Sequence, residues 1–124
     1  MCNGTVLIVE DEILIRLMLA DVLTEEGYSV VEAGNVLEAV AALGRNPAFD
    51  AVITDIDMPG CLNGLDLAHM VRTVAPRTKV VVASGGHGPE NCPVDCHFLQ
   101  KPYSVNLIIS LLAEPTFNEV AQAF

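Results

Sequence analysis

The sequence is poor in basic residues and has no long apolar run. Its 124 residues include six Lys and Arg against 16 Asp and Glu, so the formal net charge is -10. Because binding to nucleic acid or to an anionic membrane depends on basic contacts with phosphate, neither partner is expected. No apolar stretch approaches the ~18 residues that cross a bilayer, and no basic segment followed by an apolar one opens the chain. We therefore expect a soluble, cytoplasmic protein.

Cysteine pairs at the usual metal-binding or redox spacing are also missing. The cysteines are Cys2, Cys61, Cys92 and Cys96. They show neither CxxC spacing nor the density of a secreted disulfide scaffold, which fits a reducing compartment. Asp95, Cys96 and His97 follow Cys92 closely but match no standard zinc spacing. A labile disulfide between Cys92 and Cys96 stays open as a minor alternative.

Short runs rich in Val and Ile alternate with longer stretches of helical spacing. The runs predict strands at residues 5–9, 28–33, 50–54, 79–84 and 97–100. The stretches predict helices that end at Gly27, near Gly44 and before Pro76, and a last helix at 104–113 with Ser104 as N-cap. The first helix is predicted from apolar residues that recur at helical spacing: Ile13, Leu14, Leu17, Met18 and Val22. With no linker or repeat, residues 1–124 are expected to form one domain whose apolar content enters a core.

Polar residues stand where several of these strands end. They are Glu10, Asp11, Glu12, Asp55, Ser84 and Lys101. Apolar strands joined by helices predict a parallel sheet covered on both sides, with functional groups gathered at the carboxyl ends of its strands. Carboxylates brought together there repel one another unless a cation lies among them, and Mg²⁺ prefers such oxygen ligands. Lysine and hydroxyl donors beside them suit the oxygens of a phosphoryl group.

Four motifs resemble those of the receiver domain of two-component response regulators. VLIVEDE resembles the family's acidic pair, TDIDMPGCLNG its phosphoacceptor strand and loop, VVASG its switch hydroxyl, and FLQKPY its run of lysine, proline and aromatic residue. The motifs stand in the family's order and the match covers nearly the whole chain. The resemblance implies an α/β fold of the flavodoxin-like (βα)5 type, a doubly wound parallel sheet of strand order 2-1-3-4-5.

The resemblance also implies a phosphoacceptor and a metal site. By position, Asp55 accepts a phosphoryl group from a histidine kinase or a histidine phosphotransfer protein. Glu10, Asp11 and Asp55 hold Mg²⁺, together with the backbone carbonyl of Asp57. The family usually has Asp in the first acidic place, so Glu10 is a longer variant. The chain would then be a signalling protein that is phosphorylated, not an enzyme that turns over a separate substrate.

Further family positions imply a switch. Lys101 and Ser84 match residues that contact the phosphoryl oxygens, and Phe98 matches an aromatic residue that moves inward with the hydroxyl. The resemblance implies a cis peptide between Lys101 and Pro102. Output is expected through contact with a downstream protein target, as in stand-alone receivers.

The segment GGHGPENCPVDC departs from the family pattern. Receivers normally have a full fourth helix there, but the glycines and prolines of this segment leave room for about one helical turn. We therefore expect this helix to be truncated or absent, as in a subset of stand-alone receivers. The loop PGCLNG is also one residue longer than the common form.

Other interpretations of these residues remain. Asp55 and Asp57 could be a turn pair, Glu10 to Glu12 could be first-turn acids at a helix N-terminus, and Phe98 could be a simple core residue. The DxD pair is also the signature of haloacid-dehalogenase-type phosphatases, with Asp55 as nucleophile and Asp57 as acid. That motif belongs after a first strand, and 124 residues leave little room for a cap. A degenerate receiver that binds a partner without phosphorylation is the remaining alternative.

Overall fold

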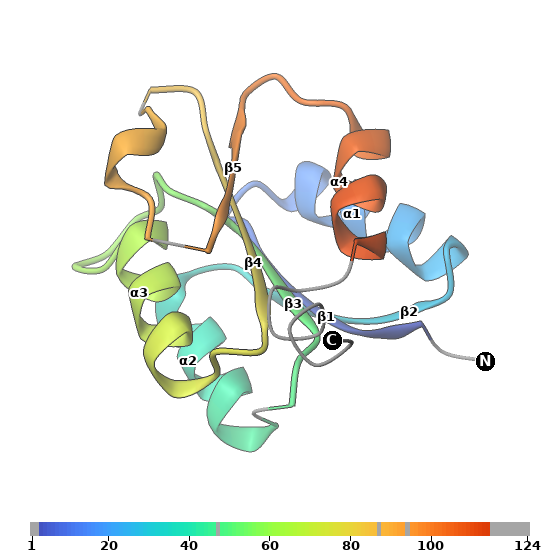
Figure 1. Ribbon diagram of the computed structural model, residues 1–124, viewed down its shortest axis with the longest axis horizontal. Helices are drawn as coiled ribbons and strands as arrows, with labels where there is room; N and C mark the ends of the chain where they lie inside the picture. The colour runs from blue at the N-terminus through green and yellow to red at the C-terminus, as the bar shows by residue number, and fades with distance from the viewer. Residues whose placement is uncertain (1–2, 47, 87, 94, 115–124) are drawn as a thin grey trace, which may run out of the picture.

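The computed structural model describes residues 3–46, 48–86, 88–93 and 95–114 (Figure 1). The strands of this part of the chain are β1 (Gly4–Val9), β2 (Tyr28–Ala33), β3 (Ala51–Asp55), β4 (Lys79–Ser84) and β5 (His97–Gln100). Its helices are α1 (Ile13–Glu25), α2 (Val36–Arg45), α3 (Gly64–Val74) and α4 (Val105–Ala113), with a single 3-10 turn, η1 (Pro89–Asn91). Every predicted strand and helix is present, and the predicted ends agree with the structure to within two residues.

The strands form one parallel sheet of order β2-β1-β3-β4-β5, as the resemblance implied. Val9 of β1 pairs with Thr54 of β3, and Asp55 of β3 pairs with Ala83 of β4. The carboxyl ends of the central strands therefore lie level with one another. Helices α1 and α4 cover one face of the sheet, and α2 and α3 cover the other (Figure 1).

The central strands are apolar along their middle because both faces of the sheet are buried there. In β1, Val6 and Ile8 pack toward α1 and α4, whereas Leu7 and Val9 pack toward α2 and α3. This alternation is the two-residue period of a strand. The sheet is thus held by two separate apolar layers, and polar groups are confined to the strand ends.

Most of the apolar residues whose spacing predicted helix α1 are exposed in the structure. Ile13, Leu14, Leu17 and Met18 are all exposed, Leu14 to 80%. Leu19, Ala20 and Leu23 are buried instead. The expectation that the apolar content enters the core is therefore wrong for this helix, which is apolar on more of its circumference than the sheet can cover.

Side-chain caps set the start of α2, α3 and α4, and Asn35 caps α2 by accepting from the Glu38 N–H. Asn63 accepts hydrogen bonds from the backbone of Leu65 and Asp66, and the Asp66 carboxylate accepts one from the Asn63 N–H at 2.8 Å. This reciprocal capping box fixes the first turn of α3. Ser104 caps α4, as predicted, by accepting from the Asn106 N–H.

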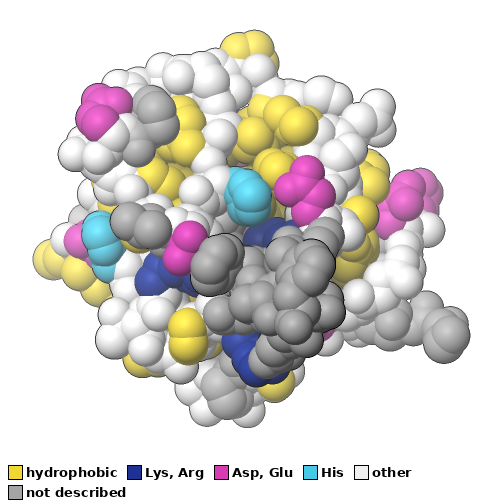
Figure 2. All heavy atoms as spheres, in the orientation of Figure 1, with side chains coloured by type: hydrophobic (Ala, Val, Ile, Leu, Met, Phe, Trp, Pro, Cys, Tyr) yellow, Lys and Arg dark blue, Asp and Glu magenta, His cyan; other side chains and the backbone are white. Residues whose placement is uncertain are grey.

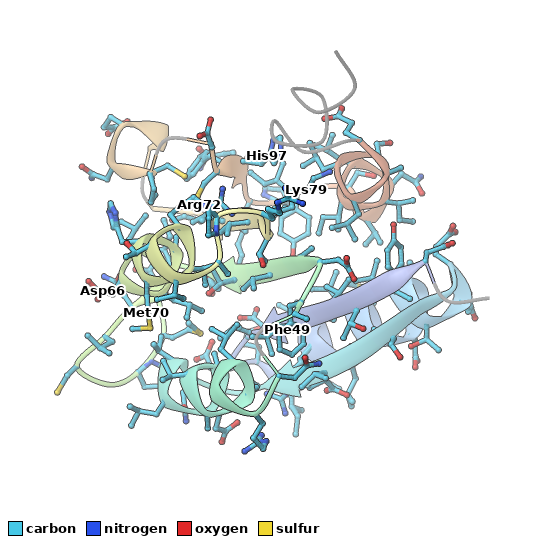
Figure 3. All side chains as sticks on the ribbon, turned by 60° about the horizontal axis from the view of Figure 1, so that its bottom comes forward. Phe49, Asp66, Met70, Arg72, Lys79 and His97 are labelled. Atoms are coloured by element: carbon cyan, nitrogen blue, oxygen red, sulfur yellow. The ribbon has the colours of Figure 1, made fainter. Side chains whose placement is uncertain are left out.

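The segment between β4 and β5 contains η1 and no longer helix among its described residues, which confirms the truncated fourth helix. At the other end of β4, the buried Lys79 donates to the backbone carbonyls of Leu111 and Glu114, joining the sheet to the end of α4 (Figure 3). The peptide between Lys101 and Pro102 is cis, as the resemblance implied.

The surface agrees with the low basic content. On the face shown in Figure 2, Lys and Arg side chains of the described residues form only small patches. Within the same part of the chain, no helix has both the length and the apolar character needed to cross a membrane.

Candidate functional site

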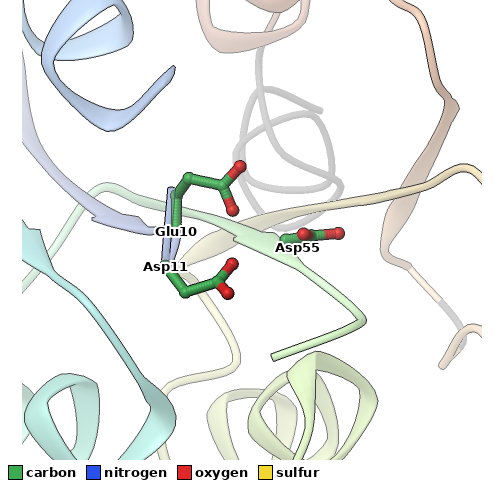
Figure 4. Close-up of side chains that lie close together, drawn as sticks. All are labelled: Glu10, Asp11 and Asp55. Carbon is green, nitrogen blue, oxygen red and sulfur yellow. The ribbon is translucent and has the colours of Figure 1, made fainter. Parts of the chain in front are cut away.

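Three carboxylates meet at the carboxyl edge of the sheet. Glu10 and Asp11 follow β1, Asp55 ends β3, and their side chains point into one space (Figure 4). One oxygen from each lies within 4.8 Å of the others. The predicted convergence of Glu10, Asp11 and Asp55 is thus present, although Asp55 lies 44 positions or more from the other two along the chain.

Lys101 lies against this cluster from the end of β5. Its Nζ is 3.1 Å from Asp55 Oδ2 and 3.8 Å from Glu10 Oε1. Partial burial lowers the pKa of Lys101, but the hydrogen bond and charge of Asp55, followed by the charge of Glu10, outweigh burial and leave the pKa raised. Lys101 is therefore a fixed positive charge beside the Asp55 carboxylate.

Glu10 is buried to a degree unusual for an acid. It is 4% exposed, and its Oε2 is buried without a hydrogen-bond partner. Burial, and then the nearby charge of Asp55, raise the pKa of Glu10 to about 7. An unpartnered oxygen in a cluster of three carboxylates fits a divalent cation with oxygen ligands, because the cation would supply both the partner and the charge.

Arg16 holds the strand end that carries Glu10. Its Nη1 donates to the Glu10 backbone carbonyl at 2.8 Å, and its Nε lies 3.2 Å from Glu32 Oε1 at the end of β2. This arginine connects α1, β1 and β2. We did not identify it from the sequence, where a single Arg in a helix carries no motif.

Gly64 is a second residue that sequence reasoning missed. A Cβ atom added there would lie 2.0 Å from the backbone oxygen of Asp55 and 2.9 Å from the Ile56 Cα. The Gly64 N–H donates to the Ile56 carbonyl at 2.9 Å. The start of α3 is therefore pressed against the backbone of Asp55, and only glycine fits between them. The sequence feature that could have identified Gly64 is its place directly after Asn63, at the end of the loop between β3 and α3.

Ser84 and Phe98 lie on the same side of the sheet. Ser84 is fully buried, and its Oγ accepts from the Gly86 N–H at 3.1 Å. Phe98 pairs with Val82 in the register of β4 and β5 and is partly buried against the core layer under α2 and α3. Because Val82 and Ser84 are two residues apart, all three side chains share one face.

The remaining predicted residues stand outside the cluster. Asp57 is exposed and its carboxylate is not part of the group of three. Glu12 is the N-cap residue of α1 without a side-chain cap hydrogen bond. Cys92, Asp95, Cys96 and His97 form no metal-ligand group among the described residues. Cys2 lies outside the residues that the structure describes.

A family model of the response regulator receiver domain matches residues 6–113. The chain belongs to the response regulator receiver family. This membership covers both halves of the site, from the acidic pair after β1 to Lys101 after β5. It establishes the chain as a receiver of phosphorelay signalling.

Comparisons with individual proteins support membership of the same family. The chain is 32% identical over 114 residues to the chemotaxis protein CheY of Thermotoga maritima, covering 86% of this chain and 92% of that one. It is 38% identical over 122 residues to the transcriptional regulatory protein PdtaR of Mycobacterium tuberculosis, covering 93% of this receiver but 58% of PdtaR. The crystal structure of a receiver protein from Sinorhizobium medicae superposes with a TM-score of 0.82 at 27% identity, covering 89% and 91% of the two chains.

Proposed function

We propose that this receiver accepts a phosphoryl group on Asp55 in a Mg²⁺-dependent reaction. The observation that carries the proposal is the Asp55 carboxylate itself, which Lys101 contacts and with which Glu10 and Asp11 form one cluster. A turn pair would not bring a lysine and two further acids from other strands to the same carboxylate. The donor is a phosphohistidine on a histidine kinase or a histidine phosphotransfer protein.

In the transfer, a carboxylate oxygen of Asp55 attacks the phosphorus atom. The new O–P bond forms as the P–N bond of the phosphohistidine breaks, and the imidazole leaves with the electron pair. The negatively charged phosphoryl oxygens then lie next to Asp55. The Lys101 ammonium, 3.1 Å from Asp55 Oδ2, lies where it stabilises that charge.

Glu10, Asp11 and Asp55 would hold Mg²⁺, with the backbone carbonyl of Asp57 as a further ligand. Bound there, the ion supplies positive charge against the phosphoryl oxygens and reduces the repulsion between them and the carboxylates. A related structure, that of the response regulator TrrA of Thermotoga maritima, is described as a complex with Mg²⁺ and BeF; it is 26% identical, with a TM-score of 0.72, over 86% of this chain. That likeness supports the same ion here.

Ser84 and Phe98 would transmit the change. Ser84 ends β4 one residue past Ala83, the register partner of Asp55, and its hydroxyl can turn toward the phosphoryl oxygens. Phe98 on the neighbouring strand packs on the same face. A shift of the hydroxyl therefore alters the packing of Phe98 and of the segment between β4 and β5, which a downstream protein target can recognise.

The exposed apolar face of α1 is the best contact surface for the phosphodonor. Ile13 comes two residues after Asp11, and Leu14, Leu17 and Met18 continue the surface along the helix. Exposed apolar patches of this kind mark protein contacts. A donor that docks here would bring its phosphohistidine beside Asp55.

Phosphorylation by acetyl phosphate tests the assignment without needing the natural kinase. We expect the wild-type chain to gain one phosphoryl group with Mg²⁺ and to lose it to hydroxylamine, which cleaves acyl phosphates. Asp55→Asn should abolish labelling. Asp57→Asn, which keeps the backbone carbonyl, should retain it.

Each alternative function gives a different result. Label that survives in Asp55→Asn contradicts the phosphoacceptor assignment. Steady turnover of phosphoesters, lost in Asp57→Asn, would indicate a phosphatase of the haloacid dehalogenase type. A wild-type chain that binds Mg²⁺ but never takes label would indicate a degenerate receiver.

A further inference from the structure

The backbone of Glu10 is held from two neighbouring elements. Its N–H donates to the carbonyl of Ala33 at the end of β2 at 3.0 Å, and its carbonyl accepts from Arg16 Nη1 at 2.8 Å. Glu10 lies one residue past the end of β1 and is 4% exposed, and the carbonyl of a buried residue needs a hydrogen-bond partner. Arg16, in the first turn of α1, supplies one.

The guanidinium of Arg16 is itself fixed in place. Its Nε lies 3.2 Å from Glu32 Oε1 on β2, so two of its donors point at two separate acceptors. A Cβ atom added at Gly34 would lie 3.2 Å from Arg16 Nη1, and the Gly34 N–H donates to Glu38 Oε1 of α2 at 2.7 Å. Because a guanidinium is planar and rigid, these neighbours set its orientation. Arg16 therefore connects α1, the end of β2 and the start of α2 to the Glu10 backbone.

We propose that Arg16 is a positioning residue that sets the affinity of the acidic cluster for Mg²⁺. This inference rests on the metal site of the proposed function. The Glu10 carboxylate extends from the peptide that Arg16 holds toward Asp11 and Asp55 (Figure 4). A rotation of that peptide would move the carboxylate out of the cluster. Groups that orient a metal ligand typically change the affinity for the metal by about 10- to 100-fold when they are removed.

The sign of the effect separates orientation from charge. A positive charge near a cation site repels the cation, so loss of the Arg16 charge alone would strengthen Mg²⁺ binding. Loss of the hydrogen bond to the Glu10 carbonyl should weaken it instead. A residue that only stabilises the fold would lower the free energy of unfolding and leave the Kd of the folded protein for Mg²⁺ unchanged.

The test is a titration of the metal-free full chain with Mg²⁺, followed by the amide chemical shifts of the acidic cluster in NMR spectra. We expect Arg16→Gln to raise the Kd for Mg²⁺ by about 10-fold. Arg16→Lys keeps the charge but not the planar pair of donors, so it should also raise the Kd. Arg45→Gln is the matched control, because it removes the same charge from the exposed end of α2 and should leave the Kd unchanged.

Glu32 provides a second comparison. If it acts by holding the guanidinium, Glu32→Gln should raise the Kd for Mg²⁺ in the wild-type background and have no further effect in Arg16→Gln. Additive effects of the two substitutions would mean that each acts through its charge alone, and would contradict the proposal.

Labelling by acetyl phosphate gives a further readout. Arg16→Gln should need about 10-fold more Mg²⁺ for its half-maximal rate and should approach the wild-type rate at saturation. The proposal is overturned if Arg16→Gln binds Mg²⁺ as tightly as the wild type or more tightly, or if Arg45→Gln loses as much affinity. Arg16→Lys decides the matter in the same way if Arg16→Gln fails to fold. A wild-type chain that does not bind Mg²⁺ would instead overturn the metal site of the proposed function, and this inference with it.

Discussion

At the scale of single residues, Gly64 ties the position of Asp55 to the start of α3. Any side chain at position 64 meets the Asp55 backbone oxygen, since the Cβ alone would come within 2.0 Å. We expect Gly64→Ala to lower the free energy of unfolding by roughly 1 to 3 kcal/mol, the usual cost of overpacking, and to slow labelling of Asp55 by acetyl phosphate.

The matched control is Gly44→Ala. Gly44 lies within α2, and an added Cβ there meets nothing within 4 Å. Alanine should therefore be neutral or stabilise the helix by up to about 1 kcal/mol. Equal stabilities of the two variants in urea titrations would show that α3 is not pressed against Asp55.

Glu10 gives the protein a pH-dependent stability. In the absence of metal, the pKa of Glu10 in the folded protein is about 7, against an ordinary value of 4.5. The folded state therefore binds this proton more tightly than the unfolded chain does. The resulting stabilisation is fully present below pH 4.5 and is lost as the pH rises through about 7.

We expect Glu10→Gln to reveal this loss. Without Mg²⁺, the wild-type free energy of unfolding should fall by on the order of 1 to 3 kcal/mol more than that of Glu10→Gln between about pH 5 and pH 8, since one pKa unit corresponds to ~1.4 kcal/mol. Urea titrations at several pH values measure the difference. Parallel pH profiles for the two proteins would rule out Glu10 as the titrating group.

At the scale of elements, α1 separates a buried face from an exposed apolar one. Leu14 is 80% exposed and Leu19 is 2% exposed, although both are leucines of the same helix. We expect Leu19→Ala to cost roughly 2 to 5 kcal/mol of unfolding free energy, as for a core leucine. Leu14→Gln should change it by less than about 0.5 kcal/mol and leave labelling by acetyl phosphate unchanged. A large loss in Leu14→Gln would place this residue in the core, contrary to the structure.

At the scale of the whole molecule, the net charge of -10 makes cation binding a source of stability. A ligand that binds only the folded chain stabilises it, by about 2.7 kcal/mol at a hundredfold excess over its Kd. We expect millimolar Mg²⁺ to raise the Tm of the wild-type protein, because the ion relieves the repulsion among Glu10, Asp11 and Asp55.

Asp11→Asn should lose most of this rise in Tm. Glu25→Gln removes one negative charge at the far end of α1 and should retain the rise in Tm. Comparison of the two variants therefore separates Mg²⁺ binding at a specific site from general screening of the negative charges. Calorimetry with and without EDTA measures both. A Tm that rises equally in the two variants would mean that Mg²⁺ acts on the net charge alone.

The sequence by itself determined the strands, the helices and the residues of the acidic site. Central strands that are apolar on both faces and alternate with helices favour a parallel sheet covered on both sides, and the two-residue period sets which side chains face which layer. Once the carboxyl ends of those strands meet, Asp55 must lie near the residues after β1 and β5. The replacement of a full helix by η1 among the described residues between β4 and β5 also followed from local chemistry, since glycine and proline oppose the interior of a helix.

Only the tertiary structure decided which apolar residues of α1 are buried. Helical period shows that a helix has an apolar face, but the position of the sheet selects the part of that face that is covered, and it covers Leu19 and Leu23. The close approach of Gly64 to Asp55 and the hydrogen bond from Arg16 to the Glu10 carbonyl likewise depend on how a helix packs against a neighbouring strand end. Such contacts leave no local pattern, because their energies exist only when the two segments are packed together.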